Sequence, residues 1–216
     1  KSGIVYCATR KNVESVCQLL QDRGFSATRY HAGLPDQERQ ENQEDFVYDR
    51  RRIMVATNAF GMGIDKSNVG YVVHYNMPKN LESYYQEAGR AGRDGEPADC
   101  ILLYAPKDVQ TAKFLILNAG ENEETSPEER TRFQTRDLER LDQMVGYCKT
   151  TACLRQYLLG YFGEHLAEPC GNCSSCQGNF VERDITVEAQ KILSGVARVE
   201  RMYPYGLGVA QVIHML

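Results

Sequence analysis

The sequence contains no tryptophan, only 7 prolines among 216 residues, and no apolar run near the ~18 residues of a membrane-spanning helix. With 18 glycines and 42% hydrophobic residues, it lies close to the average composition of globular proteins. That composition excludes a collagen-like chain and disfavours extensive disorder. Residues 1–6 have neither the apolar core nor the cleavage site of a signal peptide. We therefore expect one large or two small globular domains with no membrane contact.

The ends and the charge of the sequence give two further indications. No methionine begins the chain, and residues 209–216 still follow an apolar helical pattern where the sequence stops, which predicts a fragment of a longer protein. The net charge is -4, from 25 Lys and Arg against 29 Asp and Glu. This argues weakly against coating of nucleic acid, but a local basic groove is compatible with it, because binding depends on the local field.

Eight cysteines are distributed unevenly along the chain. Three lie in apolar segments: Cys7, Cys17 and Cys100. Four others have the spacing of metal ligands: Cys153, Cys170, Cys173 and Cys176. Because no export signal is present, a reducing compartment and a bound metal are a better interpretation than disulfides.

The cysteine run at 170–176 supplies three thiolates from one tight turn, and tetrahedral zinc needs four ligands. Cys153 is the expected fourth ligand, with Cys148 and His165 as competitors. The alternatives are free or disulfide-bonded cysteines and an iron–sulfur cluster, although the second half of a ferredoxin motif is missing. The spacing predicts a structural Zn²⁺ site with no open coordination position.

Residues 1–105 alternate between short apolar runs and segments with helical spacing, which predicts an α/β fold with a parallel sheet. The expected strands cover residues 4–7, 26–30, 53–56, 71–75 and 100–104. The expected helices cover residues 12–23, 37–48 and 80–91, with Gly24 as a C-terminal cap.

The pattern becomes mostly helical after Pro106. Helices are expected at 109–117 and at 138–162, the second with a possible break near Thr150, and a third unit begins near Ile185. The acidic segment 120–136 is expected to be a partly disordered linker, with a turn or helix start at 126–129.

The segment Tyr84–Gly95 carries two arginines, Arg90 and Arg93, with glycines between and before them. Their spacing of three places them on one helical face or at its end, where guanidinium groups suit a phosphate chain. The alternative is a solvated surface in which these arginines pair with acidic neighbours: Glu82, Glu87 and Asp94. Spacing alone does not decide between the two.

Three other segments resolve this choice: Val5–Lys11, Tyr30–Leu34 and Val55–Lys66. In this order, and followed by Tyr84–Gly95, they resemble motifs IV to VI of nucleic-acid helicases. Together with the cysteine run they resemble the RecQ family of DNA helicases over nearly the whole chain. Asn58 and Ser67 depart from the residues expected there, but neither departure removes a required chemical group.

The resemblance implies an architecture in three parts. Residues 1–105 resemble the second RecA-like lobe, residues 106–182 the mostly helical zinc-binding subdomain, and residues 183–216 the truncated start of a winged-helix domain. The family's first lobe binds most of ATP and Mg²⁺. No Gly-Lys-Thr or Gly-Lys-Ser occurs in this sequence, so we expect the chain to need that lobe as a partner and to be inactive as an ATPase alone.

The resemblance also implies roles for single residues in nucleotide and DNA binding. Arg93 matches the arginine finger and Arg90 its partner. Gln86, Asp65 and Gly63 are implied at the nucleotide site, although Asp65 could simply cap a turn. Contacts with single-stranded DNA are implied for Thr9, Arg10, Lys11, Thr57 and Asn58, and Lys79 is a plausible additional phosphate contact. His31 either contacts DNA or makes a local hydrogen bond, and 50–52 is interpreted as a solvated turn.

The expected function is that of an ATP-dependent 3′–5′ DNA helicase acting on single-stranded and duplex DNA in replication, recombination and repair. Its compartment would be the bacterial cytoplasm, at the nucleoid, or the eukaryotic nucleus. The first alternative is a non-catalytic zinc-stabilised DNA-binding or docking module derived from a helicase. The second is a redox or iron–sulfur protein.

Overall fold

The computed structural model describes residues 1–61, 66–118, 126–178 and 183–202, together with Gly208, Gln211 and Ile213. The expected site residues Gly63 and Asp65 lie outside the described residues. The chain forms two compact units, Lys1–Cys176 and Gln177–Leu216. Within the described ranges, no helix is long and apolar enough to cross a membrane.

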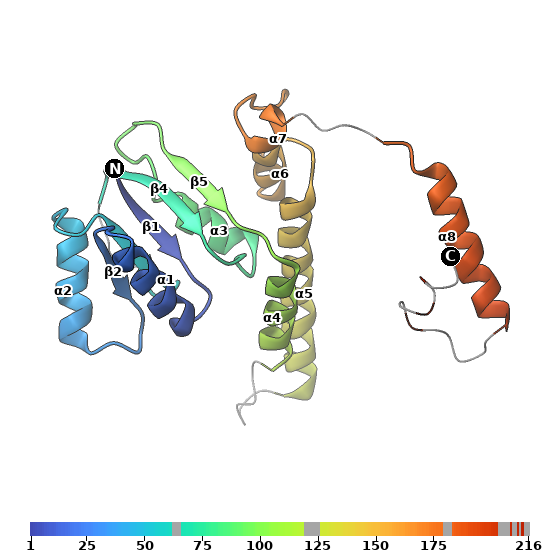
Figure 1. Ribbon diagram of the computed structural model, residues 1–216, viewed down its shortest axis with the longest axis horizontal. Helices are drawn as coiled ribbons and strands as arrows, with labels where there is room; N and C mark the ends of the chain where they lie inside the picture. Colours follow the sequence, from blue (N-terminus) through green and yellow to red (C-terminus); the bar gives the residue numbers. More distant parts are fainter. Residues whose placement is uncertain are drawn as a thin grey trace. The chain divides into compact units, whose positions relative to one another are not determined.

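A five-stranded parallel sheet forms the first part of the first unit, as the sequence predicts (Figure 1). Its strands are β1 (Ser2–Tyr6), β2 (Ala27–Tyr30), β3 (Ile53–Ala56), β4 (Val69–His74) and β5 (Asp99–Leu102). Their order is β2-β3-β1-β4-β5, so β1 lies in the middle, where Val5 pairs with Val55 on one side and Val73 on the other. The expected helices are α1 (Arg10–Asp22), α2 (Asp36–Val47) and α3 (Leu81–Ala88).

The two faces of the sheet have separate hydrophobic cores, because side chains along a strand alternate between faces. Val5 of β1 packs with Val13 and Val16 of α1. Ile4 and Tyr6, which are two residues apart in β1, pack on the other face with Phe46 of α2. Because both faces of the sheet are buried, the strands are continuous apolar runs in the sequence.

Local side-chain hydrogen bonds set the starts of the helices. Thr9 is the N-cap of α1, and its hydroxyl accepts a hydrogen bond from the Asn12 amide at 3.1 Å. The helix therefore begins at Arg10, two residues earlier than the apolar spacing indicates. Asn80 caps α3 in the same way, accepting from the Ser83 amide at 2.8 Å.

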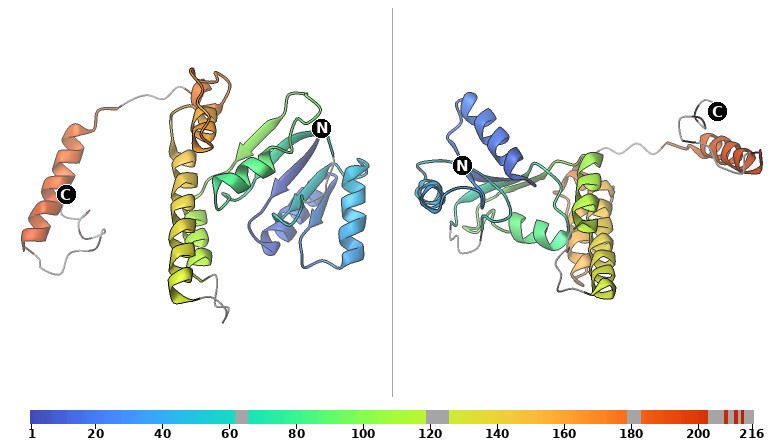
Figure 2. Two further views of the ribbon diagram at one scale, coloured as in Figure 1. Left: turned by 180° about the vertical axis from the view of Figure 1, so that it is seen from behind. Right: turned by 90° about the horizontal axis from the view of Figure 1, so that it is seen from below.

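The rest of the first unit is helical, with α4 (Pro106–Leu117), α5 (Pro127–Lys149), α6 (Leu154–Tyr161) and the short α7 (Ser174–Gln177). Figures 1 and 2 show α4 and α5 side by side. The prediction of a partly disordered linker is wrong for residues 127–136, which lie in α5. The cause is a capping box, in which Ser126 and Glu129 each satisfy the backbone amide of the other.

A third core joins these helices to the sheet through α3. Leu141 and Met144 of α5 are fully buried against Leu81 and Tyr84 of α3. The Tyr147 hydroxyl also donates a hydrogen bond to the Tyr84 hydroxyl at 3.2 Å. The helix that precedes the arginine segment is therefore packed directly on α5.

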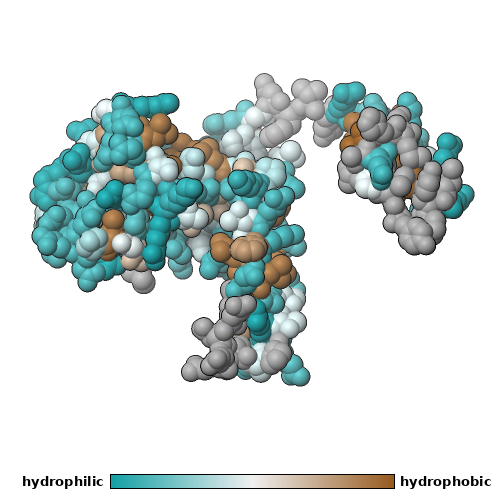
Figure 3. Space-filling view, turned by 60° about the horizontal axis from the view of Figure 1, so that its bottom comes forward, coloured by the Kyte–Doolittle hydropathy of each residue, from teal (hydrophilic) through white to brown (hydrophobic). Residues whose placement is uncertain are grey.

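Large apolar side chains are also exposed on the hairpin of α4 and α5, as Figure 3 shows. Phe114, Leu115 and Leu117 of α4 and Phe133 of α5 are each at least half exposed. Sequence periodicity did not indicate this surface, because the same residues fit a buried helical face equally well.

The second unit contains one long helix among its described residues, α8 (Thr186–Met202). Val199 is buried, whereas Ile192, Leu193 and Val196 are exposed. The assignment of residues 183–216 to the start of a winged-helix domain stays a prediction, as do the other domain limits.

Candidate nucleic-acid interface and metal centre

The carboxyl ends of β3, β1 and β4 meet at one edge of the sheet, because these strands are parallel neighbours. All six residues expected to contact DNA follow these strands: Thr57 and Asn58 after β3, Thr9, Arg10 and Lys11 after β1, and Lys79 after β4. Ligands of α/β proteins commonly bind at such an edge. The structure thus brings the six residues to one edge of the sheet.

The N-terminus of α1 concentrates positive charge at this edge. Arg10 and Lys11 are its first two residues, both are exposed, and neither forms an ion pair within the described part of the chain. The helix dipole adds partial positive charge at the same point. Thr9 uses its oxygen as an acceptor for the cap, which leaves its hydroxyl proton available for a phosphate oxygen.

A hollow of about 720 Å³ lies between this edge and α4. Three of the expected DNA contacts line it, Thr9, Asn58 and Lys79, together with Lys107 from α4. Arg10, Lys11 and Thr57 do not line it. Lys107 is a cation that the sequence interpretation missed, since nothing in its local pattern places α4 against the sheet.

Asn76 and Asp108 connect the sheet edge to α4. The Asn76 side-chain oxygen accepts hydrogen bonds from the Ala8 amide at 3.1 Å and from the Asn12 side chain at 2.9 Å. Its amide donates to Asp108 at 3.2 Å, and Asp108 also accepts from the Met77 amide at 3.0 Å. These bonds hold the loop after β4 between α1 and α4, and the sequence interpretation assigned neither residue.

A buried histidine lies at the floor of the same hollow. His74 ends β4, is 1% exposed, stacks on Tyr6 and forms a 2.9 Å contact with Glu87 of α3. Glu87 is therefore not an ion-pair partner of Arg90 or Arg93. Glu82 likewise accepts from the Tyr161 hydroxyl at 2.8 Å and pairs with Arg140 at 3.3 Å.

The arginine segment is a turn and not a helical face. Helix α3 ends at Ala88 with Gly89 as its C-cap, and Gly92 has a positive φ of 70°. Arg90 and Arg93 follow the end of the helix, so of the two positions that their spacing allowed, a helical face or the helix end, the structure shows the end. A left-handed glycine so close to the cap turns the chain away from the helix axis.

The two arginines have different environments. Arg90 is partly buried, hydrogen-bonds the Tyr6 hydroxyl, and has an Nε atom that is buried without a partner. Burial raises the pKa of Tyr6 and the Arg90 charge opposes this, so the hydroxyl stays protonated and donates to the Phe60 carbonyl at 3.1 Å. The Arg90 guanidinium also lies against Gly61, where a Cβ atom would be 2.6 Å from Cζ.

Arg93 is exposed, and its Nε donates to the Gly89 carbonyl at 3.3 Å. Neither arginine forms an ion pair with an acidic side chain in the described ranges. Asp94 instead accepts from the Glu96 amide at 3.1 Å. The solvated surface of paired charges, which the spacing alone did not exclude, is therefore not found among the described residues. Gln86 is exposed near the end of α3.

The four expected zinc ligands come together in the structure. The sulfur atoms of Cys153, Cys170, Cys173 and Cys176 lie within 4.8 Å of one another. Four sulfurs at about 2.3 Å from a tetrahedral zinc would be about 3.8 Å apart. The observed separations of 4.0 Å between Cys170 and Cys176 and 3.4 Å between Cys173 and Cys176 fit that geometry. The competitors Cys148 and His165 are not part of the cluster.

Backbone amides stabilise thiolates at this cluster. Cys153 is the N-cap of α6, and its sulfur accepts from the Cys170 amide at 3.3 Å and the Gln156 amide at 3.5 Å, which lowers its pKa. Burial opposes ionisation of Cys173, but amides of Cys176 and Leu154 overcome it and lower its pKa to about 6. The Cys176 thiol, which shares a hydrogen bond with Cys173, has its pKa raised to about 11 by that bond. The donor set fits Zn²⁺.

Two family descriptions match this chain. Residues 1–95 match the helicase conserved C-terminal domain, and residues 106–177 match the RecQ zinc-binding domain. The first match covers the sheet edge and the arginine turn, and the second covers the helical hairpin and the cysteine cluster.

Bacterial proteins named ATP-dependent DNA helicase RecQ are similar to nearly the whole chain. The protein of Bacillus subtilis is 46% identical over 213 residues, which is 99% of this chain and 34% of the relative. The protein of Pasteurella multocida is 42% identical over 218 residues, 100% of this chain and 32% of the relative. The protein of Haemophilus influenzae is 40% identical over 203 residues, which is 94% of this chain and 31% of the relative. The chain thus spans about a third of these relatives, and it belongs to the RecQ family, as the region that carries the C-terminal helicase lobe and the zinc-binding domain.

Proposed function

We propose that this chain is the second half of the motor core of an ATP-dependent DNA helicase that moves 3′ to 5′ in replication, recombination and repair. The observation that carries the proposal is the arrangement at the sheet edge. Three cations lie there without an ion-pair partner among the described residues: Arg10, Lys11 and Lys79. Arg93 is exposed in the turn that follows α3. The printed names of the relatives support the same activity.

The DNA contacts in this proposal are with phosphates. Thr9 and Thr57 offer hydroxyl groups and Asn58 an amide, while Arg10, Lys11 and Lys79 offer charge. None of these groups needs a particular base, so the fragment should bind single strands without sequence preference. With about two to four phosphates contacted, the salt dependence of binding should be shallow.

Arg93 is the proposed arginine finger, directed to the γ-phosphate of an ATP held with Mg²⁺ by the first lobe. It would neutralise charge on the transferring phosphoryl group, which in comparable enzymes is worth about 10³–10⁵ in rate. Arg90 would serve at the same interface, and Gln86, Gly63 and Asp65 would order the loops around it. The four cysteines would hold one Zn²⁺ as a folding element with no role in the reaction.

The experiment measures DNA-stimulated ATP turnover of the chain joined to a first lobe. Arg93→Ala should reduce turnover at saturating single-stranded DNA by about 10³-fold or more while ATP binding stays nearly intact. Arg93→Lys should remain severely impaired, because an ammonium group cannot present a planar fork to phosphoryl oxygens. Arg132→Ala, which removes an exposed arginine of α5, is the matched control and should behave as wild type.

Near-normal turnover of Arg93→Ala would refute the arginine-finger assignment. The alternative, a non-catalytic DNA-binding or docking module, makes a different prediction for the same experiment. Its two-lobed form would bind DNA but would show no DNA-stimulated turnover before any substitution is made.

A further inference from the structure

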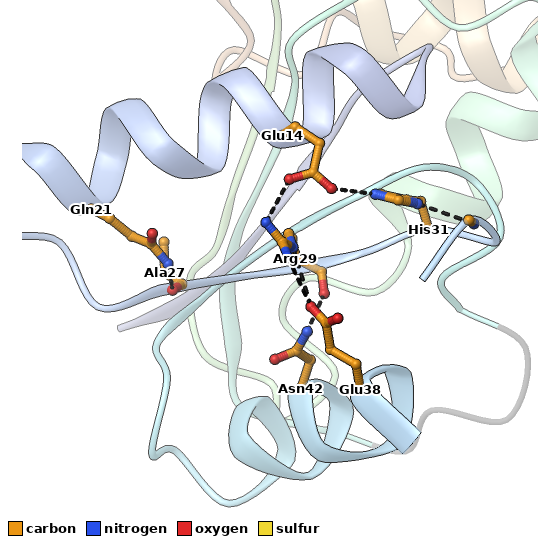
Figure 4. A network of polar contacts seen from close by, with 8 residues as sticks. Glu14, Gln21, Ala27, Arg29, His31, Glu38 and Asn42 are labelled. Atoms are coloured by element: carbon orange, nitrogen blue, oxygen red, sulfur yellow. Dashed lines mark hydrogen bonds and ion pairs between the residues drawn. The ribbon is translucent and has the colours of Figure 1, made fainter. Parts of the chain in front are cut away.

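His31 is the buried member of a polar network beside the sheet edge, shown in Figure 4. Its side chain is 6% exposed, and Nε2 lies 2.7 Å from Glu14 of α1. Its Nδ1 accepts a hydrogen bond from the Gly33 amide at 3.1 Å. Since Nδ1 accepts, Nε2 carries the proton and donates to Glu14. Both ring nitrogens are therefore used locally, and neither is left to contact DNA.

Glu14 is also fully engaged in this network. One carboxylate oxygen accepts from His31, and the other binds Arg29 at 2.6 Å. Arg29 in turn pairs with Glu38 of α2 at 3.0 Å. Glu14 lies four residues after Arg10 on α1, the spacing at which a glutamate and an arginine ordinarily pair. Its two partners in the network hold Glu14 away from that pairing, which leaves the Arg10 charge uncompensated.

The turn that His31 fixes lies directly under Arg10. A Cβ atom on Gly33 would be 3.1 Å from Nη1 of Arg10 and 3.2 Å from its Cδ. The Arg10 side chain therefore lies across Gly33, where a methyl group would force Arg10 to shift by a few tenths of an ångström. The Gly33 amide that His31 holds belongs to this same turn.

We propose that His31 is a positioning residue for DNA binding, which acts through Gly33 and Glu14 to present the Arg10 guanidinium to a phosphate of the bound strand. The proposal rests on the proposed function, because it requires that Arg10 contacts DNA. His31 itself touches no part of the DNA. Its removal would let the turn move and let Glu14 reach Arg10, so that the cation is both displaced and partly neutralised.

A double-mutant cycle tests this with the zinc-loaded chain and labelled oligothymidylate, with affinity measured by fluorescence anisotropy over a series of salt concentrations. Arg10→Ala should weaken binding and reduce the salt slope by about 0.7, the loss of one phosphate contact. His31→Ala should weaken binding about 3–10-fold in the wild-type background and by less than about twofold in the Arg10→Ala background. His165→Ala, an exposed histidine outside the network and the cysteine cluster, is the matched control.

Two conservative variants separate positioning from a general structural role and keep the test valid should His31→Ala fold poorly. His31→Asn places an oxygen near the position of Nδ1, so it keeps the Gly33 contact but loses the donor to Glu14. His31→Gln keeps a donor near Glu14 but loses the acceptor for Gly33. Each of these variants should therefore weaken binding in the wild-type background by less than His31→Ala does. Melting temperature and zinc content verify that each variant is folded.

Each result decides the proposal. Equal weakening by His31→Ala in both backgrounds would overturn it, since His31 would then act independently of Arg10. Wild-type affinity of His31→Ala would overturn it as well. If Arg10→Ala itself left binding unchanged, the failure would belong to the proposed DNA contact, and the inference would fall with it.

Discussion

Substitution of Gly61 by alanine tests whether this glycine makes room for Arg90. The added methyl group would lie 2.6 Å from Cζ of Arg90, whereas carbon atoms in contact are about 3.5 Å apart or more. The guanidinium must therefore move by about 1 Å. Gly61 also has a φ of 146°, a conformation that costs an L-residue about 1–3 kcal/mol. For a chain of this size that cost lowers the melting temperature by about 2–12 °C.

The functional effect should exceed the effect on stability. A displacement of about 1 Å in a positioned catalytic group can cost about 10²-fold in rate. In the two-lobed protein, Gly61→Ala should therefore lower DNA-stimulated ATP turnover per folded molecule by about 10²-fold with ATP affinity nearly unchanged. Arg90 should report the change directly through the NMR signal of its Nε–H group.

Gly24→Ala is the matched control for this prediction. Gly24 also has a positive φ, 81°, but a Cβ atom added there would have no neighbouring atom within 4 Å. Alanine there should destabilise the chain by backbone strain alone and leave turnover per folded molecule unchanged. If Gly61→Ala lost stability but kept its turnover per folded molecule, as Gly24→Ala should, the argument that Gly61 accommodates Arg90 would be wrong.

The remaining predictions concern the metal and the pH dependence of stability. The freshly purified chain should contain one zinc by elemental analysis; Cys173→Ser should lose it, and Cys148→Ser should keep it, because Cys148 is outside the thiol cluster. Less than half an equivalent of zinc in the wild-type chain would contradict this. Hydrogen bonds from Ser2, Lys66 and Asn68 lower the pKa of Asp49 to about 2, so its contribution to stability is present above about pH 4 and is lost as pH falls toward 2. Asp49→Asn should therefore flatten acid unfolding between pH 4 and 2. It should cost no more than about 1 kcal/mol at pH 7, because the ion pair with Lys66 is screened by solvent at the half-exposed Asp49. An unchanged acid profile would contradict the assignment.

Local signals made part of the fold and of the site predictable. Apolar runs buried on both faces identify parallel strands, and the parallel arrangement alone places Thr9, Thr57 and Lys79 at one edge. The cysteine run at 170–176 has a spacing that a single metal explains. In each case the chemistry depends on residues close in sequence or on an edge that the topology defines.

Other features depend on contacts between distant parts of the chain. Asn76 and Asp108 are 32 residues apart and carry no motif, so only the packed structure reveals that they join the sheet edge to α4. The helix expected over 80–91 stops at Ala88, where Gly89 is the cap, and Gly92, which has a positive φ, turns the chain beyond Arg90. The sequence predicts a turn or helix start at 126–129, and α5 begins there with the Ser126–Glu129 capping box, whereas the acidic composition of 120–136 indicated a partly disordered linker.

Helix α3 links the metal centre to the arginine turn through few intermediates. Cys153, a proposed zinc ligand, is the N-cap of α6, and Tyr161 at the other end of that eight-residue helix donates to Glu82 of α3. Tyr84, in the same helix as Glu82, packs against Tyr147 of α5 and against His74, which holds Glu87. Arg90 lies only two residues after α3 ends. Because each contact in this series is a packed or hydrogen-bonded pair, we expect that metal bound at the four cysteines would restrain the base of the arginine turn through α6. If the proposed roles are correct, a zinc site with no part in the reaction would still influence where the proposed catalytic arginines lie.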